Sequence, residues 1–178
     1  MTDYVVAGTG SRSLRMADRA AQIDAMERCT AILEQRQAEK GPFLVVMSGG
    51  TEGFDELIAR CALKLGIFLW LALPNRTYVG HYWGRASVTG RDRRGDFAEI
   101  MNGAGRVTHV MEEVHGTTEL KLNGKHANFW RNDWMVQQAQ EFLVWDPTSK
   151  GTAHCLTQIK KAGLPYKVLS PEPATLPL

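Results

Sequence analysis

The 178-residue sequence lacks the features that mark several large classes of protein. Its longest apolar run, Ile67–Leu73, is far shorter than the roughly 20 residues that cross a bilayer, so we expect no membrane span. Its three cysteines are widely spaced, which indicates free thiols in a reducing compartment and not a disulfide framework. The N-terminus has no basic segment of the kind that begins a signal peptide, and we therefore predict a cytoplasmic protein.

An excess of charge is missing as well. Lys and Arg number 21 and Asp and Glu number 19, so the net charge of +2 is too small for a protein that coats nucleic acid. The 44% of apolar residues exclude a disordered chain, and the length suits one domain with its own core. We predict a single domain over residues 1–170, with an insertion at about 75–128 and a proline-rich tail at 171–178.

Several motifs of catalysis and cofactor binding are also absent. The first glycine-rich loop has Ser13 where a dinucleotide-binding fingerprint requires its third glycine, and no Gly-Lys-Ser/Thr follows a four-residue spacer as in a P-loop. Ser48 does not stand in the Gly-x-Ser-x-Gly context of a hydrolase nucleophile. No two of the five histidines have the helical spacing of metal ligands. We therefore predict no metal and no cofactor.

What the sequence does contain is a regular alternation of strand-like and helix-like segments. Short, continuously apolar runs are typical of buried parallel strands, and the segments between them carry helix formers or apolar residues at helical spacing. This alternation predicts a parallel sheet with helices on both faces. The predicted strands are Tyr4–Ala7, Phe43–Met47, Ile67–Leu73, Phe142–Trp145 and Tyr166–Leu169, and the predicted helices are Leu14–Gln37, Phe54–Leu65, Asn128–Gln140 and Gly151–Ala162.

Three of the predicted strands end in glycine-containing loops that lead into a helix. Glycine lets backbone amides approach a phosphate, a helix N-terminus attracts anions, and the carboxyl ends of parallel strands meet at one edge of the sheet. A single loop of this kind is often only a connector between a strand and a helix. Three such loops at one edge of the sheet favour a site for phosphate and ribose. The residues predicted to bind there are Gly8, Gly10, Ser11, Arg12, Ser48, Gly49, Gly50, Thr51, Gly53, Lys150, Gly151 and Thr152.

Two pairs of polar residues are further candidates. Asp55 and Glu56 stand in the first helical turn after the second loop, where one of them accepts ribose hydroxyls or both only complement the helix dipole. They are also the candidates for a catalytic carboxylate. Arg131 and Asn132, near the start of a helix, either point back at the same edge or lie on a solvated face, with Asn128 as the N-cap.

Positive charge is concentrated in the segment Arg76–Gly95. It contains five arginines and one acidic residue, Asp92, and four aromatic or imidazole side chains are interleaved with them. Arginine among aromatics suits a ligand with a base and a phosphate, although a solvated loop above packed aromatics is the alternative. We predict that this segment closes over the ligand or forms a subunit interface.

Short motifs follow one another in a fixed order along the chain. They are Gly10–Arg12, Ser48–Ala59, Leu73–Pro74, Arg131–Val136, Leu143–Asp146 and Lys150–Thr152. In this order they resemble the SLOG superfamily, which groups the DprA-like and cytokinin-activating LOG-like Rossmann proteins, and most closely its YspA/YpsA-related branch. The resemblance implies a nucleotide or nucleotide-derived ligand bound across these loops, with Pro74 among the contacts.

The resemblance implies less about catalysis. LOG-like hydrolases carry a Pro-Gly-Gly-x-Gly-Thr-x-x-Glu motif, whose glutamate serves the cleavage of an N-glycosidic bond. Cys155 stands at that position here, in an apolar stripe with Ile159 and Ala162, which favours a thiol of the core. Glu56 or Asp55 is left to supply a carboxylate from another loop.

These observations together predict an α/β protein with a Rossmann-like, doubly wound, mostly parallel sheet. We expect it to bind a nucleotide-derived small molecule, such as an ADP-ribose-like or cyclic-nucleotide signal, as a sensor, carrier or sequestering module. One alternative is an enzyme that cleaves an N-glycosidic bond of a nucleotide, and another is a module that binds single-stranded DNA. We also expect a homo-oligomer, either a dimer or a tetramer, and no membrane partner.

Overall fold

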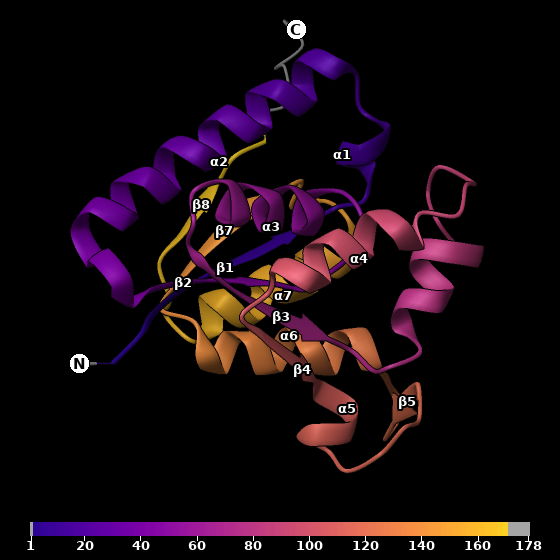
Figure 1. Ribbon diagram of the computed structural model, residues 1–178. Coiled ribbons are helices and arrows are strands. Elements are labelled where there is room, and N and C mark those ends of the chain that lie inside the picture. The colour runs from indigo at the N-terminus through magenta and orange to yellow at the C-terminus, as the bar shows by residue number, and fades with distance from the viewer. Residues whose placement is uncertain (1, 171–178) are drawn as a thin grey trace, which may run out of the picture.

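A six-stranded sheet with every pairing parallel forms the centre of the molecule (Figure 1). The computed structural model describes residues 2–170, so the predicted tail at 171–178 lies outside the described residues. The strand order is β4-β3-β2-β1-β7-β8. These strands are β1 (Tyr4–Gly10), β2 (Leu44–Ser48), β3 (Phe68–Leu73), β4 (Arg106–His109), β7 (Glu141–Trp145) and β8 (Tyr166–Val168). A separate antiparallel hairpin is formed by β5 (Lys121–Leu122) and β6 (Lys125–His126).

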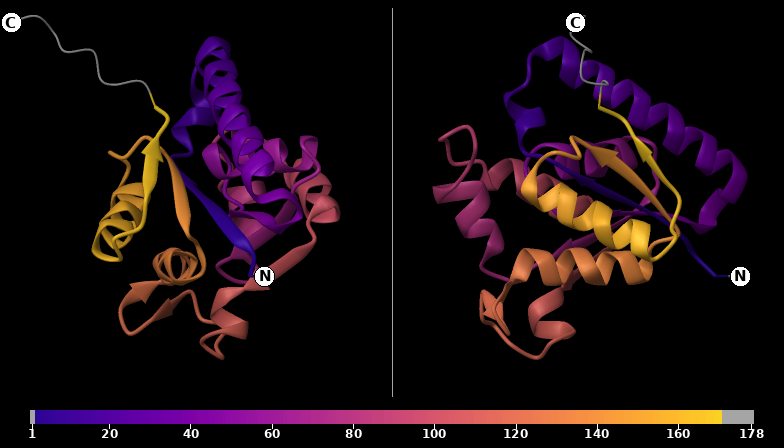
Figure 2. Two further views of the ribbon diagram at one scale, coloured as in Figure 1. Left: turned by 90° about the vertical axis from the view of Figure 1, so that its left-hand side faces the viewer. Right: turned by 180° about the vertical axis from the view of Figure 1, so that it is seen from behind.

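The connecting segments supply helices to both faces of the sheet. The helices are α1 (Ser13–Met16), α2 (Arg19–Lys40), α3 (Phe54–Lys64), α4 (Arg94–Gly103), α5 (Val110–Glu113), α6 (Ala127–Gln138) and α7 (Lys150–Lys161), with short helical turns at Gly41–Phe43 and Gly80–Arg85. Figure 2 shows α2 and α3 on one side of the sheet and α6 and α7 on the other. Within the described residues, no helix has the length and apolarity of a membrane span.

Alternate residues of each strand build two separate cores. Val6 of β1 packs in the cluster that contains α2 and α3 residues, whereas Val5 and Ala7 pack in the cluster that contains α6 and α7 residues. Successive side chains of a strand point to opposite faces, so a strand covered on both faces must be apolar throughout. This explains why the apolar runs are continuous, and it confirms the predicted fold class.

The order of the strands reverses at β1. From β1 the chain adds β2, β3 and β4 on one side and then crosses over to add β7 and β8 on the other. In an open parallel sheet, such a reversal leaves a crevice beyond the carboxyl ends of the two strands that flank it. The topology therefore places the predicted site after β1 and β7.

Two of the predicted elements differ from the observed ones by more than two residues. The helix predicted over residues 14–37 is two helices, α1 and α2, because Asp18 starts a new helix by accepting a hydrogen bond from the Ala21 amide at 2.8 Å. Strand β1 continues to Gly10, beyond the predicted end at Ala7, and pairs there with Trp145 of β7.

The structure divides the region 75–128 into parts of different character. Helix α4 and strand β4 continue the alternation, and β4 is the edge strand of the main sheet beside β3. The remaining parts are irregular: residues 74–93 contain the turn at Gly80–Arg85, and residues 110–126 contain α5 and the small hairpin. Those parts lie outside the alternation of strands and helices that builds the main sheet.

Candidate functional site

A cleft of about 450 Å³ opens at the carboxyl ends of β1 and β7. Its walls come from the segment after β1, the loop before α3, the turn at 78–88, the first half of α6 and the N-terminus of α7. Its lining residues are Thr9, Gly10, Ser11, Arg12, Thr51, Asp55, Tyr78, Tyr82, Val88, Asn128, Phe129, Arg131, Asn132, Ser149, Gly151 and Thr152.

Asp55 and Arg131 form a buried, oppositely charged pair in this cleft. Asp55 is 4% exposed and Arg131 is 6% exposed, and Arg131 Nη1 lies 3.6 Å from Asp55 Oδ2. The same nitrogen donates a hydrogen bond to the Gly49 carbonyl. Asp55 Oδ1 and Arg131 Nε have no hydrogen-bond partner among the described residues. Each side chain therefore has a free hydrogen-bonding atom in a site where an unpaired polar atom is costly.

Burial raises the pKa of the Asp55 carboxyl, and the nearby Arg131 charge opposes that shift only in part. The folded protein therefore holds a proton on Asp55 at pH values where the unfolded chain has released it. As the pH rises through the folded-state pKa, this contribution to stability is lost.

This pKa shift gives a first prediction for Asp55→Asn, which removes the titration at nearly constant size. The variant's free energy of unfolding, relative to wild type, should rise as the pH increases above the ordinary carboxyl pKa of about 4, because only the wild type loses the Asp55 contribution. Urea unfolding at each pH measures the difference. A difference that falls or stays constant as the pH increases contradicts the raised pKa.

The N-terminus of α7 forms the opposite wall of the cleft. Ser149 caps this helix, since its hydroxyl accepts a hydrogen bond from the Thr152 amide at 3.4 Å. A Cβ atom built on Gly151 would meet no heavy atom within 4 Å, so the cleft is open there. The side-chain amide of Asn132 donates to the Gly151 carbonyl at 3.4 Å and fixes α6 against this turn. The helix start thus presents its positive dipole end to the cleft.

Arg12 brings a further positive charge from the end of β1. Its Nη1 donates to the Ala86 carbonyl at 3.3 Å, and its guanidinium carbon lies 5.6 Å from the centre of the Tyr82 ring. The backbone amides before it are already used, because β1 pairs with β7 as far as Gly10 and the Ser11 amide donates to the Trp145 carbonyl at 3.3 Å. The side chain of Arg12, and not a row of glycine amides, is therefore what this loop offers to an anion.

The structure brings about half of the predicted site residues together. Those that line the cleft are Gly10, Ser11, Arg12, Thr51, Asp55, Arg131, Asn132, Gly151 and Thr152. Those that do not line it are Gly8, Ser48, Gly49, Gly50, Gly53, Glu56, Pro74 and Lys150. Among the latter, Gly53 and Glu56 line a separate hollow between α2 and α3, Pro74 lines a smaller cavity beside the cleft, and Lys150 is exposed.

The second glycine loop supports the site from beneath. The Ser48 hydroxyl donates to the Asp55 carbonyl at 2.7 Å and accepts from the Gly50 amide at 3.1 Å. The Gly50 carbonyl accepts from Trp83 Nε1 at 2.8 Å, and Gly49 lies against the Arg131 guanidinium. The loop therefore holds Asp55 and Arg131 in place, and Ser48, Gly49 and Gly50 themselves are buried.

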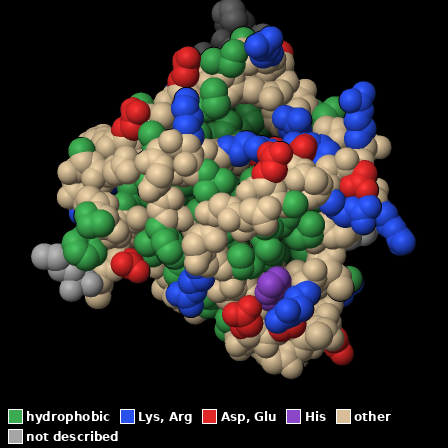
Figure 3. Space-filling view, viewed as in Figure 1, with side chains coloured by type: hydrophobic (Ala, Val, Ile, Leu, Met, Phe, Trp, Pro, Cys, Tyr) green, Lys and Arg blue, Asp and Glu red, His purple; other side chains and the backbone are tan. Residues whose placement is uncertain are grey.

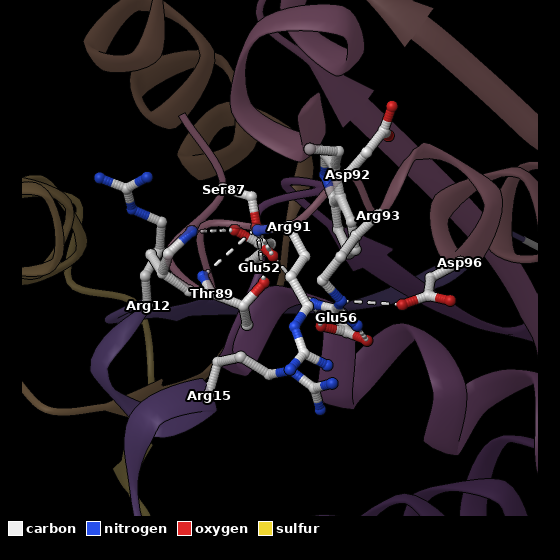
Figure 4. A network of polar contacts seen from close by, with 12 residues as sticks. Arg12, Arg15, Glu52, Glu56, Ser87, Thr89, Arg91, Asp92, Arg93 and Asp96 are labelled. Carbon is white, nitrogen blue, oxygen red and sulfur yellow. Dashed lines mark hydrogen bonds and ion pairs between the residues drawn. The ribbon is translucent and has the colours of Figure 1, made fainter. Parts of the chain in front are cut away.

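Glu56 belongs to a buried ion cluster outside the cleft (Figure 4). Arg93 Nη2 lies 2.8 Å from Glu56 Oε1, and Arg93 Nη1 lies 2.9 Å from Glu52 Oε1. Glu52, which is 0% exposed, also accepts from the Ser87 hydroxyl at 2.9 Å and from the Val88 amide at 2.7 Å. The cluster fastens the arginine-rich segment to the loop before α3, and it explains why Glu56 is turned away from the cleft.

This cluster also shows that part of the positive charge in the segment Arg76–Gly95 is neutralised within the protein. Arg93 is neutralised by buried carboxylates, and Arg94 lies beside Asp92. Figure 3 shows Lys and Arg side chains gathered on the side of the molecule where this segment lies, with acidic side chains among them. Part of the charge predicted to face a ligand is therefore structural.

Some residues of the cleft were not among the predicted site residues. They are Thr9, Tyr78, Tyr82, Val88, Asn128, Phe129 and Ser149. Tyr78, Tyr82 and Val88 show that the irregular segment does wall the cleft. His126, and not Asn128, caps α6, which leaves the Asn128 side chain at the cleft. Ser149 could have been predicted from the sequence, because a serine shortly before the Gly151–Thr152 turn is typical of the N-cap of the helix that follows.

Cys155, at the position of the LOG-type glutamate, is buried in the core on the α6–α7 side of the sheet. Burial raises the pKa of its thiol to about 11, so it is protonated at neutral pH. Asp55 is the one acidic side chain among the described residues that line the cleft. Nowhere in residues 2–170 do three His, Cys, Asp or Glu side chains group so that they could hold a metal ion.

Three solved structures resemble this fold. DprA from Streptococcus pneumoniae aligns with a TM-score of 0.60 and 14% identity over 93% of this chain and 50% of that chain. DprA from Helicobacter pylori aligns with a TM-score of 0.61 and 15% identity over 98% and 68%. The structural genomics target TM1055 aligns with a TM-score of 0.54 and 15% identity over 92% and 72%. No family model and no curated protein matches the sequence.

These likenesses support the Rossmann-like α/β fold and agree, at the level of fold, with the resemblance to the SLOG superfamily. The chain spans about half the length of the S. pneumoniae protein. The H. pylori protein binds single-stranded DNA. At such low identity, neither the YspA/YpsA-related branch nor an activity is carried over, and the branch stays a prediction.

Proposed function

We propose that the cleft binds a nucleotide or a nucleotide-derived small molecule, of the ADP-ribose or cyclic-nucleotide kind, and that the protein acts as its sensor, carrier or sequestering module. The observation that carries this proposal is Asp55, a buried carboxylate with one oxygen unpaired, beside a buried arginine that also has an unpaired donor. A ribose with two neighbouring hydroxyls satisfies such a carboxylate, because each hydroxyl is a donor and an acceptor.

The two ends of the cleft suit the phosphate of the same ligand. Arg12 lies at one side, and the open N-terminus of α7 at Gly151 lies at the other. A phosphate between them gains a charged partner and the helix dipole together. The cleft volume of about 450 Å³ lies within the range of small-molecule sites.

Calorimetric titration of the purified protein tests the proposal. The panel contains ADP-ribose, AMP, a cyclic dinucleotide, ribose 5-phosphate and inorganic phosphate. We expect the ribose-containing compounds to bind and Asp55→Asn to weaken them about tenfold, the value of one charge-assisted hydrogen bond. Asp24→Asn, on the exposed face of α2, is the matched control and should bind as wild type does. Failure of every compound to bind the wild type rejects the proposal.

The same samples separate binding from cleavage. Recovery of intact AMP and ADP-ribose by chromatography after incubation supports a binding module. Release of free base identifies the enzyme that cleaves an N-glycosidic bond, and Asp55→Asn should then abolish the release, since Asp55 is the carboxylate of the cleft.

Single-stranded DNA is the second candidate ligand, favoured by the H. pylori DprA likeness and by arginines near the cleft. Arg15 and Arg91 line a surface hollow together with Arg93, and among the described residues neither Arg15 nor Arg91 makes an ion pair (Figure 4). Fluorescence anisotropy with labelled oligothymidylate tests this candidate. Binding that weakens steeply with salt, and that Arg15→Ala and Arg91→Ala reduce, identifies DNA as the ligand.

A further inference from the structure

A second, smaller cavity of about 230 Å³ adjoins the cleft. Its lining residues come from the end of β3, the turn at 77–82, the chain that leads into the β5–β6 hairpin, and the start of α6. Tyr78, Tyr82 and Asn128 line both the cleft and the cavity, so these three side chains form the partition between them. The cavity thus extends the proposed ligand site.

Asn75 is a buried polar residue in the wall of this cavity, and it is 1% exposed. The Thr77 hydroxyl donates to its Oδ1 at 3.2 Å, whereas its Nδ2 has no hydrogen-bond partner among the described residues. Exchanging the oxygen and nitrogen of the amide does not help, because the same hydroxyl then accepts from Nδ2 and leaves Oδ1 unpaired. One atom of the carboxamide is therefore left for a partner from outside the described chain.

Asn128, in the partition, has the same property. Its Nδ2 donates to the Tyr82 hydroxyl at 3.4 Å, and its Oδ1 has no partner among the described residues. An unpaired polar atom in a buried position is destabilising, so a gap left by imperfect packing of apolar side chains would not be expected to contain two of them. The two groups point to a ligand that carries both hydrogen-bond donors and acceptors.

The aromatic side chains define the shape of that ligand. The Tyr78 and Tyr82 rings lie 4.6 Å apart with 33° between their planes. The Tyr78 hydroxyl is hydrogen-bonded to the Thr51 hydroxyl at 2.6 Å, and Thr51 lines the cleft near Asp55. The Tyr78 ring therefore separates a flat group in the cavity from the proposed ribose position beside Asp55.

We propose that this smaller cavity holds the nucleobase of the ligand, with Asn75 and Asn128 bonding to the edge of the base and a tyrosine ring against its face. This inference rests on the proposed function, since it extends the same site. A nucleobase is planar and carries donors and acceptors on its edge, and asparagine forms paired hydrogen bonds with such edges. A cavity of this size takes one base and sets the specificity of the site.

The test compares AMP with ribose 5-phosphate, which lacks the base, by calorimetric titration. Wild type should bind AMP at least tenfold more tightly. Asn75→Ala should reduce the ratio of the two affinities about tenfold, because the base loses a hydrogen bond while the sugar phosphate does not. Leu120→Trp, at a cavity position that is 54% exposed, should reduce the same ratio by blocking the cavity without disturbing the core.

Two control variants match these changes. Asn102→Ala alters an exposed asparagine of α4, and Val114→Trp adds the same indole ring at an exposed position outside the cavity; both should keep the ratio of wild type to within twofold. If both ligands bind but Asn75→Ala and Leu120→Trp leave the ratio unchanged, or weaken both ligands equally, the base pocket is refuted and the proposed function stands. If neither ligand binds the wild type, the proposed function fails first.

Discussion

Arg93→Ala is expected to lower the free energy of unfolding by about 3–5 kcal/mol, the usual cost of removing one partner from a buried ion pair. Arg93 is 7% exposed and reaches two carboxylates, Glu52 and Glu56, which are themselves buried. Without the guanidinium, Glu52 stays in a dry environment with no counter-charge, and Glu56 keeps only Arg60, whose side chain is 42% exposed. The loss is large because burying an unpaired charge costs far more than a pair contributes when intact.

The same substitution also acts on packing and on the cleft. The Arg93 guanidinium carbon lies 5.1 Å from the centre of the Trp83 ring, and Trp83 bonds to the second glycine loop through Gly50. The Glu52 carboxylate accepts a hydrogen bond from the Val88 amide, and Val88 lines the cleft. We therefore expect the variant to bind the proposed ligand more weakly even at temperatures where it stays folded.

Urea unfolding followed by circular dichroism measures the effect. Arg91→Ala is the matched control, because Arg91 lies two positions away, is exposed and makes no ion pair among the described residues. Its free energy of unfolding should stay within about 0.5 kcal/mol of wild type. Equal effects of the two variants would show that Arg93 contributes no more than a surface charge.

The fold was predictable because its signals are local. The continuous apolar run Ile67–Leu73 indicates a strand that is buried on both faces of the sheet. The helical spacing of Phe54 and Ile58 indicates a helix that is buried on one face. Each pattern lies within a few residues of sequence. The break between α1 and α2 was missed, since Asp18 lies in a stretch of good helix formers and its role as a cap depends on the backbone turning there.

The site was only partly predictable, because its contacts join distant parts of the chain. Glu52 and Arg93 are far apart in sequence, and counting charges cannot show that one neutralises the other. Arg131 similarly reaches the Gly49 carbonyl from another helix. Glycines were assigned to the ligand on their local pattern, whereas Gly8 and Gly10 serve the close approach of α3 side chains to β1. Glycine by itself does not distinguish a ligand from a packed side chain as its neighbour.

Gly49→Ala is expected to weaken binding of the proposed ligand by about 10- to 100-fold, the value of a charge-assisted hydrogen bond of about 1.5–3 kcal/mol. A Cβ atom at this position would overlap Nη1 of Arg131 and would lie 2.5 Å from both Arg131 Cζ and Asp55 Oδ2. Gly49 does not have a positive φ angle, so alanine fits the backbone and the effect is one of space alone. The arginine must leave its place beside Asp55, which removes both charged groups from their positions in the cleft.

The shift of Arg131 separates this variant from a general loss of stability. Overpacking should cost about 1–3 kcal/mol of the free energy of unfolding, so the protein stays folded and calorimetric titration with AMP can be done at low temperature. Gly95→Ala is the control glycine, since its Cβ would meet no heavy atom within 4 Å and it lies in α4; it should bind as wild type and unfold no more easily. If Gly49→Ala binds AMP with the wild-type affinity, then Arg131 and Asp55 do not hold the ligand, and the site must lie elsewhere on the sheet edge. Because the two glycine variants add the same methyl group, a difference in AMP affinity between them reports the crowding of Arg131 and Asp55 and not the change of residue type.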